Sequence, residues 1–482
     1  MSPVSPDAGD YVYPAASITA KMQRMAHVDF DRALIERHNV SGPRYTSYPT
    51  VLQFDTTFHE TDYRRIAQAS NTGSPPVDLS LYFHLPFCAR LCYYCACNKV
   101  VTKKRELAVP YLEHLQREIA LQSELYDRRR TVTQLHWGGG TPTFLSDVQM
   151  RALMDTTRRH FTLAQGDAGE FGIELDPREV REPTLAVLRD LGFNRASLGI
   201  QDFEPAVQKA VNRIQSEALT GRVIDEARRV GFSSVSVDLI YGLPFQTTAT
   251  MAATLSKIIA LDPDRISIYN YAHLPERFPP QRRLDAATMP SAASKLDLLK
   301  LCIDRFCGAG YDYIGMDHFA KPTDELSKAQ AAGTLQRNFQ GYSTQSDCDL
   351  IGMGVTAIGT IGGSFYQNLK DLDAYGAALD AGRLPIEKGL EPDADDRLRR
   401  RVIMQLICQF ELRFADFAVD FAAMFSAELP RLAAMADDGL LVLDTDGIRV
   451  TAKGRLLIRN ICMVFDRHLS LRTEATRFSK VI

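Results

Sequence analysis

The chain has 482 residues, of which 45% are hydrophobic and 24% charged, and its formal net charge is −3. This is the composition of a globular protein with room for two or three domains, and the slight negative charge argues against a partner such as nucleic acid or an anionic membrane. No run of about 18 apolar residues occurs, so we expect no membrane span. The N-terminus, MSPVSPDAGDYVYP, has no apolar signal core, which predicts a cytoplasmic location.

The first part of the chain has few signs of regular structure. Residues 1–30 read as a poorly ordered tail. The segment 41–50, SGPRYTSYPT, is rich in Gly, Pro and Ser, which favours extended or turn structure over helix. From its composition alone this segment is a surface linker, although it carries Arg44, Tyr45 and Tyr48.

A cysteine-rich stretch follows, LYFHLPFCARLCYYCACNKV. The alternating run at 79–85 predicts a strand, and Cys88, Cys92, Cys95 and Cys97 lie just beyond it. A loop of this kind can hold zinc, form a disulfide or bind an iron–sulfur cluster. Zinc sites usually use two separated pairs of ligands, and disulfide frameworks are typical of secreted chains. The C-x3-C-x2-C spacing of the first three cysteines favours a [4Fe–4S] cluster with one iron left open for a ligand that is not protein. The remaining cysteines, 302, 307, 348, 408 and 462, read as small buried hydrophobic residues.

Between residues 79 and 271 strand-like and helix-like runs alternate. The expected strands are 79–85, 132–137, 170–175, 195–200, 233–240 and 264–270. The expected helices between them are 108–125, 146–161, 183–191, 216–230 and 247–260. Repeated strand–helix units indicate parallel strands covered by helices, with functional residues at the carboxyl ends of the strands.

Candidate site residues stand at those strand ends. The glycine turn 138–140 follows the second strand, and glycine lets a backbone approach a ligand closely, although a tight turn alone would look the same. Glu174 ends the third strand, where a carboxylate facing a barrel mouth is often functional. Gln201 ends the fourth strand. Asp238 stands in the apolar fifth strand and needs a partner there; it is either a site residue or a structural acid bound by backbone N–H groups.

Beyond residue 279 the pattern changes. A helix is expected at 291–308, and the polar–aromatic strings at 314–322 and 337–345 read as loops. The Gly-rich apolar string 351–359 follows. Residues 395–468 predict a smaller, mainly helical unit with a helix at 396–410 and a hairpin near Asp446, which together resemble a winged helix.

The cysteine spacing, with the aromatic Tyr94 before the third cysteine, resembles that of the radical S-adenosylmethionine (SAM) enzymes. The wider string, with Tyr82, His84, Pro86 and Phe87 before the cysteines and Cys97-Asn98-Lys99 after them, is similar to the oxygen-independent coproporphyrinogen III dehydrogenase (oxidase) family of haem synthesis. The resemblance runs from about residue 45 to the C-terminus. It implies an α/β fold in which a partial (β/α)6 radical SAM barrel carries an extra N-terminal segment and a mainly helical C-terminal domain. The expected divisions are 1–78, 79–360 and 361–482.

The same resemblance implies the site residues. Cys88, Cys92 and Cys95 are expected to hold the cluster, and Cys97 is predicted not to be a ligand. A first SAM molecule is expected to contact Tyr82, Gly139, Glu174 and Ile358. A second is expected to contact Tyr94, Gly140, Thr141, Gln201, Arg213, Asp238 and Ala272. Because segment 41–50 matches the family's own N-terminal segment, our hypothesis is that Arg44 meets a substrate carboxylate, to which Arg can bind in a two-pronged way.

The reaction that this resemblance implies is the anaerobic conversion of two propionates of coproporphyrinogen III to vinyl groups, with loss of CO2, giving protoporphyrinogen IX. A 5′-deoxyadenosyl radical from SAM is expected to remove the hydrogen, because acid–base side chains cannot attack an unactivated CH2. An electron donor and an acceptor that the sequence does not identify are required, and a monomer is expected. Two alternatives stay open: a haem chaperone of the same superfamily, and a redox-sensing DNA-binding regulator built on the C-terminal unit.

Overall fold

The computed structural model describes residues 28–73, 76–345 and 348–470, so most of the expected N-terminal tail lies outside the described residues. Six parallel strands form its centre and pair in the order β9-β8-β7-β6-β4-β1. These strands are β1 Leu79–Leu85, β4 Thr131–Gly139, β6 Glu170–Leu175, β7 Arg195–Gln201, β8 Ser234–Tyr241 and β9 Arg265–Asn270. They match the expected strands to within about two residues, and the partial (β/α)6 barrel is confirmed.

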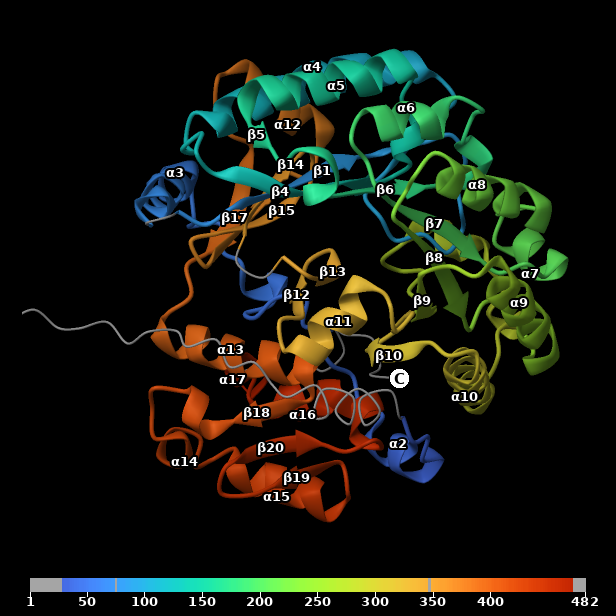
Figure 1. Ribbon diagram of the computed structural model, residues 1–482, viewed down its shortest axis with the longest axis vertical. Helices are drawn as coiled ribbons and strands as arrows, with labels where there is room; N and C mark the ends of the chain where they lie inside the picture. Colours follow the sequence, from blue (N-terminus) through green and yellow to red (C-terminus); the bar gives the residue numbers. More distant parts are fainter. Residues whose placement is uncertain (1–27, 74–75, 346–347, 471–482) are drawn as a thin grey trace, which may run out of the picture.

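Helices follow the strands and cover the outer face of the sheet (Figure 1). They are α4 Ala108–Ser123, α5 Asp147–His160, α6 Thr184–Asp190, α7 Pro205–Ala210, α8 Glu217–Arg229, α9 Thr248–Leu261 and α10 Ala292–Gly308. Their starts carry the local signals that stop a strand and begin a helix. Ser146 accepts a hydrogen bond from the Gln149 backbone and the Gln149 side chain accepts one from the Ser146 backbone, which forms a capping box at α5.

The sheet continues on both sides of the barrel, which the sequence did not predict. The strands β14 Asp349–Met353, β15 Ile358–Ile361, β16 Ser364–Asn368 and β17 Ile386–Leu390 extend it beyond β1, with α12 Leu372–Asp380 inserted before β17. On the other edge, β11 His318–Ala320 and β10 Asp312–Gly315 extend it beyond β9. The short strand β5 Thr162–Leu163 pairs separately with β4. Because β14 runs parallel to β1, residues about 270 positions apart are direct neighbours, as in Leu81 beside Ile351. The large sheet therefore passes residue 360, the boundary expected from the sequence.

The two polar–aromatic strings that read as loops are hairpins, so that interpretation was wrong. Residues 314–322 contain β11 and the end of β10. Residues 337–345 contain most of β12 Gln336–Asn338 and all of β13 Gly341–Ser343, preceded by α11 Glu325–Ala332. Three-residue strands are too short to produce a recognisable alternation, which is why the pattern misses them. In Figure 1 the β12–β13 hairpin and α11 lie between the large sheet and the C-terminal unit.

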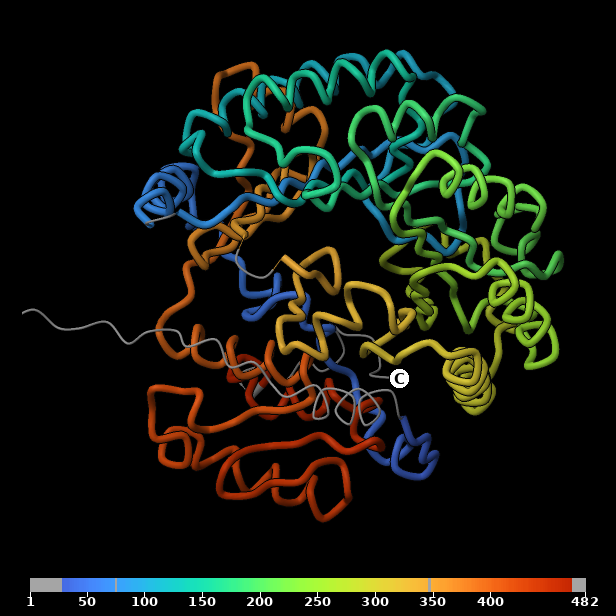
Figure 2. Tube along the Cα trace, in the orientation of Figure 1, coloured from blue at the N-terminus to red at the C-terminus, as the bar shows by residue number. Residues whose placement is uncertain are grey.

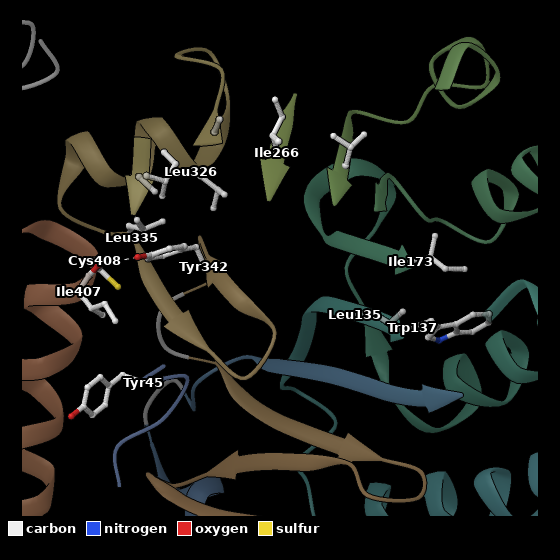
Figure 3. Packing of buried hydrophobic residues seen from close by; sticks show 14 of the residues in the cluster. Tyr45, Leu135, Trp137, Ile173, Ile266, Leu326, Leu335, Tyr342, Ile407 and Cys408 are labelled. Carbon is white, nitrogen blue, oxygen red and sulfur yellow. Dashed lines mark hydrogen bonds between the residues drawn. The ribbon is translucent and has the colours of Figure 1, made fainter. Parts of the chain in front are cut away.

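The C-terminal unit combines helices with a small antiparallel sheet in the order β18-β20-β19. Its elements are α13 Ala394–Gln409, β18 Glu411–Arg413, α14 Phe421–Met424, α15 Leu429–Asp437, β19 Leu441–Leu443, β20 Gly447–Val450, α16 Ile458–Val464 and α17 Arg467–Ser470. The long helix and the hairpin around Asp446 stand where the sequence predicts them. One hydrophobic core joins this unit to the barrel: Figure 3 shows Trp137 and Ile173 of the barrel wall, Tyr342 of β13 and Ile407 of α13 within the same cluster.

The N-terminal segment joins the two parts of the molecule. It contains α2 Arg32–His38 and α3 Glu60–Ala69, and in Figure 2 its blue trace crosses from the red C-terminal unit to the sheet. The Tyr45 hydroxyl donates to Asp466 (3.0 Å), and the Tyr48 hydroxyl accepts from the backbone of Arg467 (3.2 Å). Arg459 donates to the carbonyl of Pro43 (2.8 Å). Segment 41–50 is extended, as expected, but it is packed into the protein and is not a surface linker. Throughout the described ranges, no helix is long and apolar enough to cross a bilayer.

Two smaller strands flank the cysteines. They are β2 Phe87–Cys88 and β3 Val100–Val101, which pair in parallel. The cysteine loop is therefore closed at its base by a short ladder directly after β1.

Candidate active site

The cysteine loop and the glycine turn are bound to each other at the carboxyl ends of β1 and β4. The backbone of Gly140 donates to the carbonyl of Leu85 (2.9 Å), and that of Thr141 donates to the carbonyl of Phe87 (2.8 Å). A Cβ on Gly140 would lie 2.7 Å from both of those carbonyl oxygens, so this contact requires glycine. Gly139 has φ of +104°, which also favours glycine. The expected glycine motif thus has a structural reason at both positions.

Two arginines donate hydrogen bonds to the sulfur of Cys92. Arg178 Nη2 and Arg213 Nη1 each lie 3.5 Å from Cys92 Sγ. Asp176 Oδ2 accepts from both guanidinium groups, at 2.7 Å from Arg178 and 3.1 Å from Arg213. Burial disfavours the charge of Asp176, but the two arginines outweigh it and hold the pKa of Asp176 below its usual value. Guanidinium N–H groups that point at a sulfur can also donate to a metal-bound thiolate, which is the form of cysteine that ligates metals.

The other cysteines of the loop differ in environment. The Thr141 hydroxyl donates to Cys88 Sγ (3.6 Å), while burial raises the pKa of Cys88 to about 11. A hydrogen bond from Cys97 lowers the pKa of Cys95 to about 6, and Lys99 acts in the same direction against burial. Cys97 itself is exposed. Lys99 Nζ donates to the carbonyl of Cys95 (3.1 Å) and to that of Cys97 (3.2 Å), which fixes the end of the loop.

This loop fits an iron–sulfur cluster by its donor chemistry. Cys88, Cys92 and Cys95 lie on one loop that is closed by the β2–β3 ladder, and hydroxyl, guanidinium and ammonium groups surround their sulfurs. In the part of the chain that the structure describes, no three His, Cys, Asp or Glu side chains gather closely enough to share a single metal ion. Cluster ligands bind different irons of the cube, so they do not need to converge on one point.

A cavity of about 420 Å³ occupies the inside of the barrel. Four of the predicted site residues line it: Tyr82 on β1, Glu174 on β6, Asp238 on β8 and Ile358 at the start of β15. They meet there because alternate side chains of each strand point inward. The structure thus brings Tyr82, Glu174 and Ile358, three of the four residues expected around a first SAM molecule, to one cavity.

Glu174 links the cavity to the glycine turn. Its Oε2 accepts from the backbone of Gly139 (3.0 Å), and its Oε1 lies 3.4 Å from His136 Nε2. Burial opposes the charge of Glu174, but His136 and the Gly139 N–H lower its pKa below the usual value. The ring of His136 also stacks on Tyr82, with 6.0 Å between ring centroids. Glu174 is therefore an ionised acceptor that faces the cavity.

Asp238 has hydroxyl partners and not the backbone N–H groups considered from the sequence. Ser197 Oγ donates to its Oδ2 at 3.2 Å, and the Ser267 hydroxyl also donates to it. Burial raises the pKa of Asp238 to about 6, and the negative charge of Glu174 adds to that effect. The carboxyl is exposed to the barrel cavity, so it is available to a ligand.

Of the residues expected around a second SAM molecule, Tyr94 belongs to the cysteine loop, and Thr141 and Arg213 donate to its sulfurs. The backbone carbonyl of Tyr94 accepts a hydrogen bond from the Gln281 side chain (3.1 Å), and the Tyr94 side chain packs against the apolar cluster that contains Tyr271. Gln201 ends β7 with φ of +71°, and its Oε1 is buried without a partner, as is Nε of Arg213. Ala272 follows the end of β9. Only Asp238 of this set lines the barrel cavity, so the set does not form one cavity wall.

Arg44 lies on the N-terminal segment at the barrel opening. Its guanidinium pairs with Asp317 and stands 5.8 Å from the ring centre of Tyr269. A smaller cavity, of about 220 Å³, lies between residues 43–52, Phe339 and Ile358. Arg44 is thus near the expected site, with a protein carboxylate as its present partner.

Sequence reasoning missed several residues of this site. His84 and His136 line the cavity, and Asp176 and Arg178 support Cys92. The signal for the last two was the string Asp-Pro-Arg directly after the Glu174 strand, at a strand end. The signal for His136 was its alternation with Gln134 and Gly138 on the inward face of β4.

Comparison with known proteins agrees with this geometry. A family model described as the radical SAM superfamily matches residues 82–258, and one described as the HemN C-terminal domain matches residues 393–457. The chain is 52% identical to an oxygen-independent coproporphyrinogen III oxidase of Pseudomonas aeruginosa over 460 residues, which covers 94% of this chain and 99% of the relative. It is 48% identical to the protein of that name from Escherichia coli, with 94% and 99% covered.

A solved structure gives the same result. Coproporphyrinogen III oxidase (HemN) from Escherichia coli, described as a radical SAM enzyme, superimposes with a TM-score of 0.87 at 47% identity and covers 92% of this chain and 100% of its own. Together these matches span both the barrel and the C-terminal unit. The chain therefore belongs to the oxygen-independent coproporphyrinogen III oxidase family of the radical SAM superfamily.

Proposed function

We propose that this protein catalyses the oxygen-independent oxidative decarboxylation of two propionates of coproporphyrinogen III to vinyl groups, giving protoporphyrinogen IX. The observation that carries the proposal is the C-x3-C-x2-C loop at the carboxyl ends of the strands, where Arg178 and Arg213 donate to Cys92. The relatives named for this activity support it over nearly the whole chain. As a radical SAM protein, the chain uses a [4Fe–4S] cluster and SAM.

The bound cluster and SAM supply the radical chemistry that removes hydrogen from an unactivated CH2 group. The residues of the chain do the rest. Cys88, Cys92 and Cys95 would hold the cluster, while Thr141, Arg178 and Arg213 direct donors at their sulfurs. The barrel walls exclude water from the reacting centre.

The SAM contacts that we propose are those that the family resemblance implies. For a first molecule we assign Tyr82, Gly139, Glu174 and Ile358. The ionised carboxylate of Glu174, beside the glycine turn, supports a site for the ammonium group of the methionine part. For a second molecule we assign Tyr94, Gly140, Thr141, Gln201, Arg213, Asp238 and Ala272. The buried unpaired atoms Gln201 Oε1 and Arg213 Nε support an additional polar ligand near them. Equilibrium dialysis of SAM against the cluster-loaded protein should give two molecules per chain; one molecule would contradict the second site.

The activity test is an anaerobic assay. The reconstituted protein, SAM, a chemical reductant and coproporphyrinogen III should yield a product with two vinyl groups, seen by chromatography after oxidation to the porphyrin. Cys92→Ser should abolish the product, and Cys307→Ser, a change in a partly buried cysteine on α10, should not. A wild-type protein that carries its cluster but forms no vinyl product would overturn the proposal.

Two alternatives predict different results. A haem chaperone would bind haem stably and leave coproporphyrinogen III unchanged, whereas a redox-sensing regulator would bind DNA with salt-dependent affinity. The relatives and the solved structure carry the oxidase name, which favours the enzyme.

The remaining assignments are proposals from the sequence. We infer a cytoplasmic monomer with no nucleic acid or membrane partner, and an electron donor and acceptor that are separate molecules. Light scattering after size-exclusion chromatography tests the monomer. The division into an N-terminal segment (1–78), a barrel with its extension and a C-terminal unit also stands as a proposal, with the second boundary moved from 360 to about 390 because β17 belongs to the large sheet.

A further inference from the structure

A second, larger cavity lies next to the barrel cavity. It has a volume of about 700 Å³ and is lined by residues of α13, of β12 and of the first halves of β1 and β4. Four arginines line it: Arg337 from β12 and Arg397, Arg400 and Arg401 from α13. The three on α13 share one helix face because of their spacing. We name this cavity, with these four side chains, the arginine chamber.

The charge of the arginine chamber is not balanced by protein carboxylates. Within residues 28–73, 76–345 and 348–470, none of the four arginines forms a salt bridge. Asp416 is the one acidic residue among the described lining residues, and its backbone carbonyl accepts from Arg401 (2.6 Å). Arg397 donates to the carbonyl of Pro392 (3.1 Å). Several guanidinium groups around one cavity repel one another, so an anion in the chamber would be attracted to all of them.

Arg337 has the strongest need for a ligand. The residue is 8% exposed, and its Nε and Nη1 atoms are buried without a hydrogen-bond partner. Its guanidinium stacks on the ring of Tyr342 at 4.7 Å, and the Tyr342 hydroxyl donates to the carbonyl of Ile407 (3.0 Å), which ties β13 to α13 (Figure 3). Buried donors without acceptors are costly, so these N–H groups indicate a missing acceptor.

Arg400 and Arg401 are held in the same manner. Arg400 stacks on Phe365 at 4.7 Å and donates to the carbonyl of Gly363 (3.2 Å), and Arg401 stacks on Phe417 at 4.7 Å. Burial lowers the pKa of Arg400 to about 10, which reflects a charge without a counter-ion. A guanidinium that stacks on a ring still presents paired N–H donors at its edge, and such a pair matches the two oxygens of a carboxylate.

The arginine chamber adjoins the barrel cavity. Gln134, Asn338 and Leu350 line both cavities, so the two cavities share these side chains as a common wall. A ligand of macrocycle size with acidic arms can place one arm in the barrel cavity and others in the chamber. The substrate class proposed above has this form, with carboxylates at the periphery of a ring system.

We propose that the arginine chamber binds carboxylates of the tetrapyrrole's propionate arms while the arm that reacts lies in the barrel cavity. This inference rests on the proposed function for the identity of its ligand. The binding is non-covalent, with guanidinium N–H groups donating to carboxylate oxygens. The chamber sets which arm can enter the barrel, because the arms that it holds are kept from the reacting centre.

The test uses the cluster-loaded full-length protein. Arg397→Gln/Arg401→Gln removes two charges from the chamber, and Arg413→Gln/Arg449→Gln removes two exposed charges from the sheet of the same unit as a matched control. Coproporphyrin III, the oxidised fluorescent tetracarboxylate, is the binding probe. We expect the chamber variant to raise the Kd of the probe and the KM for coproporphyrinogen III about tenfold or more, with SAM affinity unchanged. The control should equal wild type. Arg337→Lys, which keeps the charge and loses the fork, should weaken probe binding as well.

The outcomes separate the chamber from the proposed function. If wild type forms the vinyl product and the chamber variant binds the probe as tightly as the control, the chamber proposal is overturned and the function stands. If wild type forms no product, the function fails, and the Kd comparison still decides whether the chamber binds a tetracarboxylate. Inorganic phosphate serves as a small-anion probe, and its competition with coproporphyrin III supports a shared anion site. If the chamber variant lost phosphate binding but still bound coproporphyrin III like wild type, the chamber would be a site for small anions and the proposal would be overturned.

Discussion

Asp176 and Arg213 form a nearly buried salt bridge of 3.1 Å, and the same guanidinium donates to the sulfur of Cys92. Asp176 therefore positions a cation that contacts a predicted cluster ligand. A second arginine, Arg178, makes the same two contacts. The charge of this carboxylate is needed to keep two guanidinium groups together in a site of low exposure.

Asp176→Asn should destabilise the loop and lower its cluster content. Removing one partner of a buried ion pair typically lowers the free energy of unfolding by about 3–5 kcal/mol. Here the substitution removes the shared partner of two arginines, Arg178 and Arg213. The measurements are iron content and visible absorbance after reconstitution, together with the thermal unfolding midpoint. Asp190→Asn is the control, because Asp190 forms an exposed pair with Arg151 at 3.4 Å, and such pairs contribute about 0–1 kcal/mol. Equal cluster content in the two variants would contradict a role for Asp176.

Cys97→Ser should retain the cluster, whereas Cys92→Ser should lose it. Cys97 is exposed and hydrogen-bonded to Cys95, and a serine hydroxyl can donate the same bond. Cluster absorbance under anaerobic conditions distinguishes the two variants. If Cys97→Ser lost absorbance as completely as Cys92→Ser, Cys97 would be a ligand and the assignment of three cysteines would be wrong.

Gly140→Ala should impair SAM binding. The added methyl group would meet the carbonyl oxygens of Leu85 and Phe87 at 2.7 Å, and backbone atoms cannot rotate away from it. The turn must then leave the cysteine loop, and we expect SAM affinity to fall about tenfold or more. Gly308→Ala, at the end of α10 where an added methyl group meets no atom within 4 Å, is the control and should bind SAM like wild type. Titration of SAM into each protein measures the difference.

Glu118 predicts a pH dependence of stability. It is fully buried, and its carboxylate accepts from the backbone of Gly354 (2.7 Å), from Asn368 (2.7 Å) and from the Tyr375 hydroxyl (2.6 Å). Burial raises the pKa of Glu118 to about 7 in the folded protein, whereas in the unfolded chain the carboxyl has the ordinary pKa of a glutamate. Between these two pKa values the folded protein keeps a proton that the unfolded chain has released. The resulting stabilisation is fully present at low pH and is lost as the pH rises to about 7, with a span of about 3 kcal/mol.

Glu118→Gln tests this dependence, because glutamine does not titrate. Between pH 5 and pH 8 the unfolding midpoint of wild type should fall more than that of the variant, over the interval bounded by the two pKa values. The variant Glu124→Gln, on the exposed end of the same helix region, should follow wild type. Parallel curves for wild type and Glu118→Gln would show that this carboxyl does not contribute.

Arg44→Ala should raise the KM for coproporphyrinogen III about tenfold with a smaller change in kcat, as expected for a lost carboxylate contact. The present partner of Arg44, Asp317, would exchange with the substrate. Arg37→Ala, which removes an arginine that is 62% exposed, is the control. An unchanged KM in Arg44→Ala would exclude this contact.

The sequence predicted the elements whose pattern is regular and missed those whose pairing is distant. The six barrel strands have apolar runs of regular pattern, so Glu174 and Asp238 could be placed on strands of one barrel. β14 could not be predicted beside β1, because its partner lies about 270 residues earlier. Arg337 stood in a string that read as a loop, and its neighbourhood could not be predicted because Tyr342, on which it stacks, is bound to Ile407 of the distant α13. Asp176 and Arg178 were visible as a charged strand end, but Cys92, to which Arg178 donates, lies 86 residues earlier.

The attachment of segment 41–50 to the last helices has a consequence for biosynthesis. Tyr45 is 421 residues from its partner Asp466, and Tyr48 and Pro43 are bound from the same distant region. A ribosome that adds about 5–20 residues per second needs roughly 20–80 seconds to cover that interval. Throughout this time the barrel can form, but Tyr45 and Tyr48 lack the hydrogen-bond partners that residues 466 and 467 supply. The segment that carries Arg44 is therefore completed by the last helices, and a chain released early would carry every cysteine of the loop while Tyr45 and Tyr48 remained without these partners.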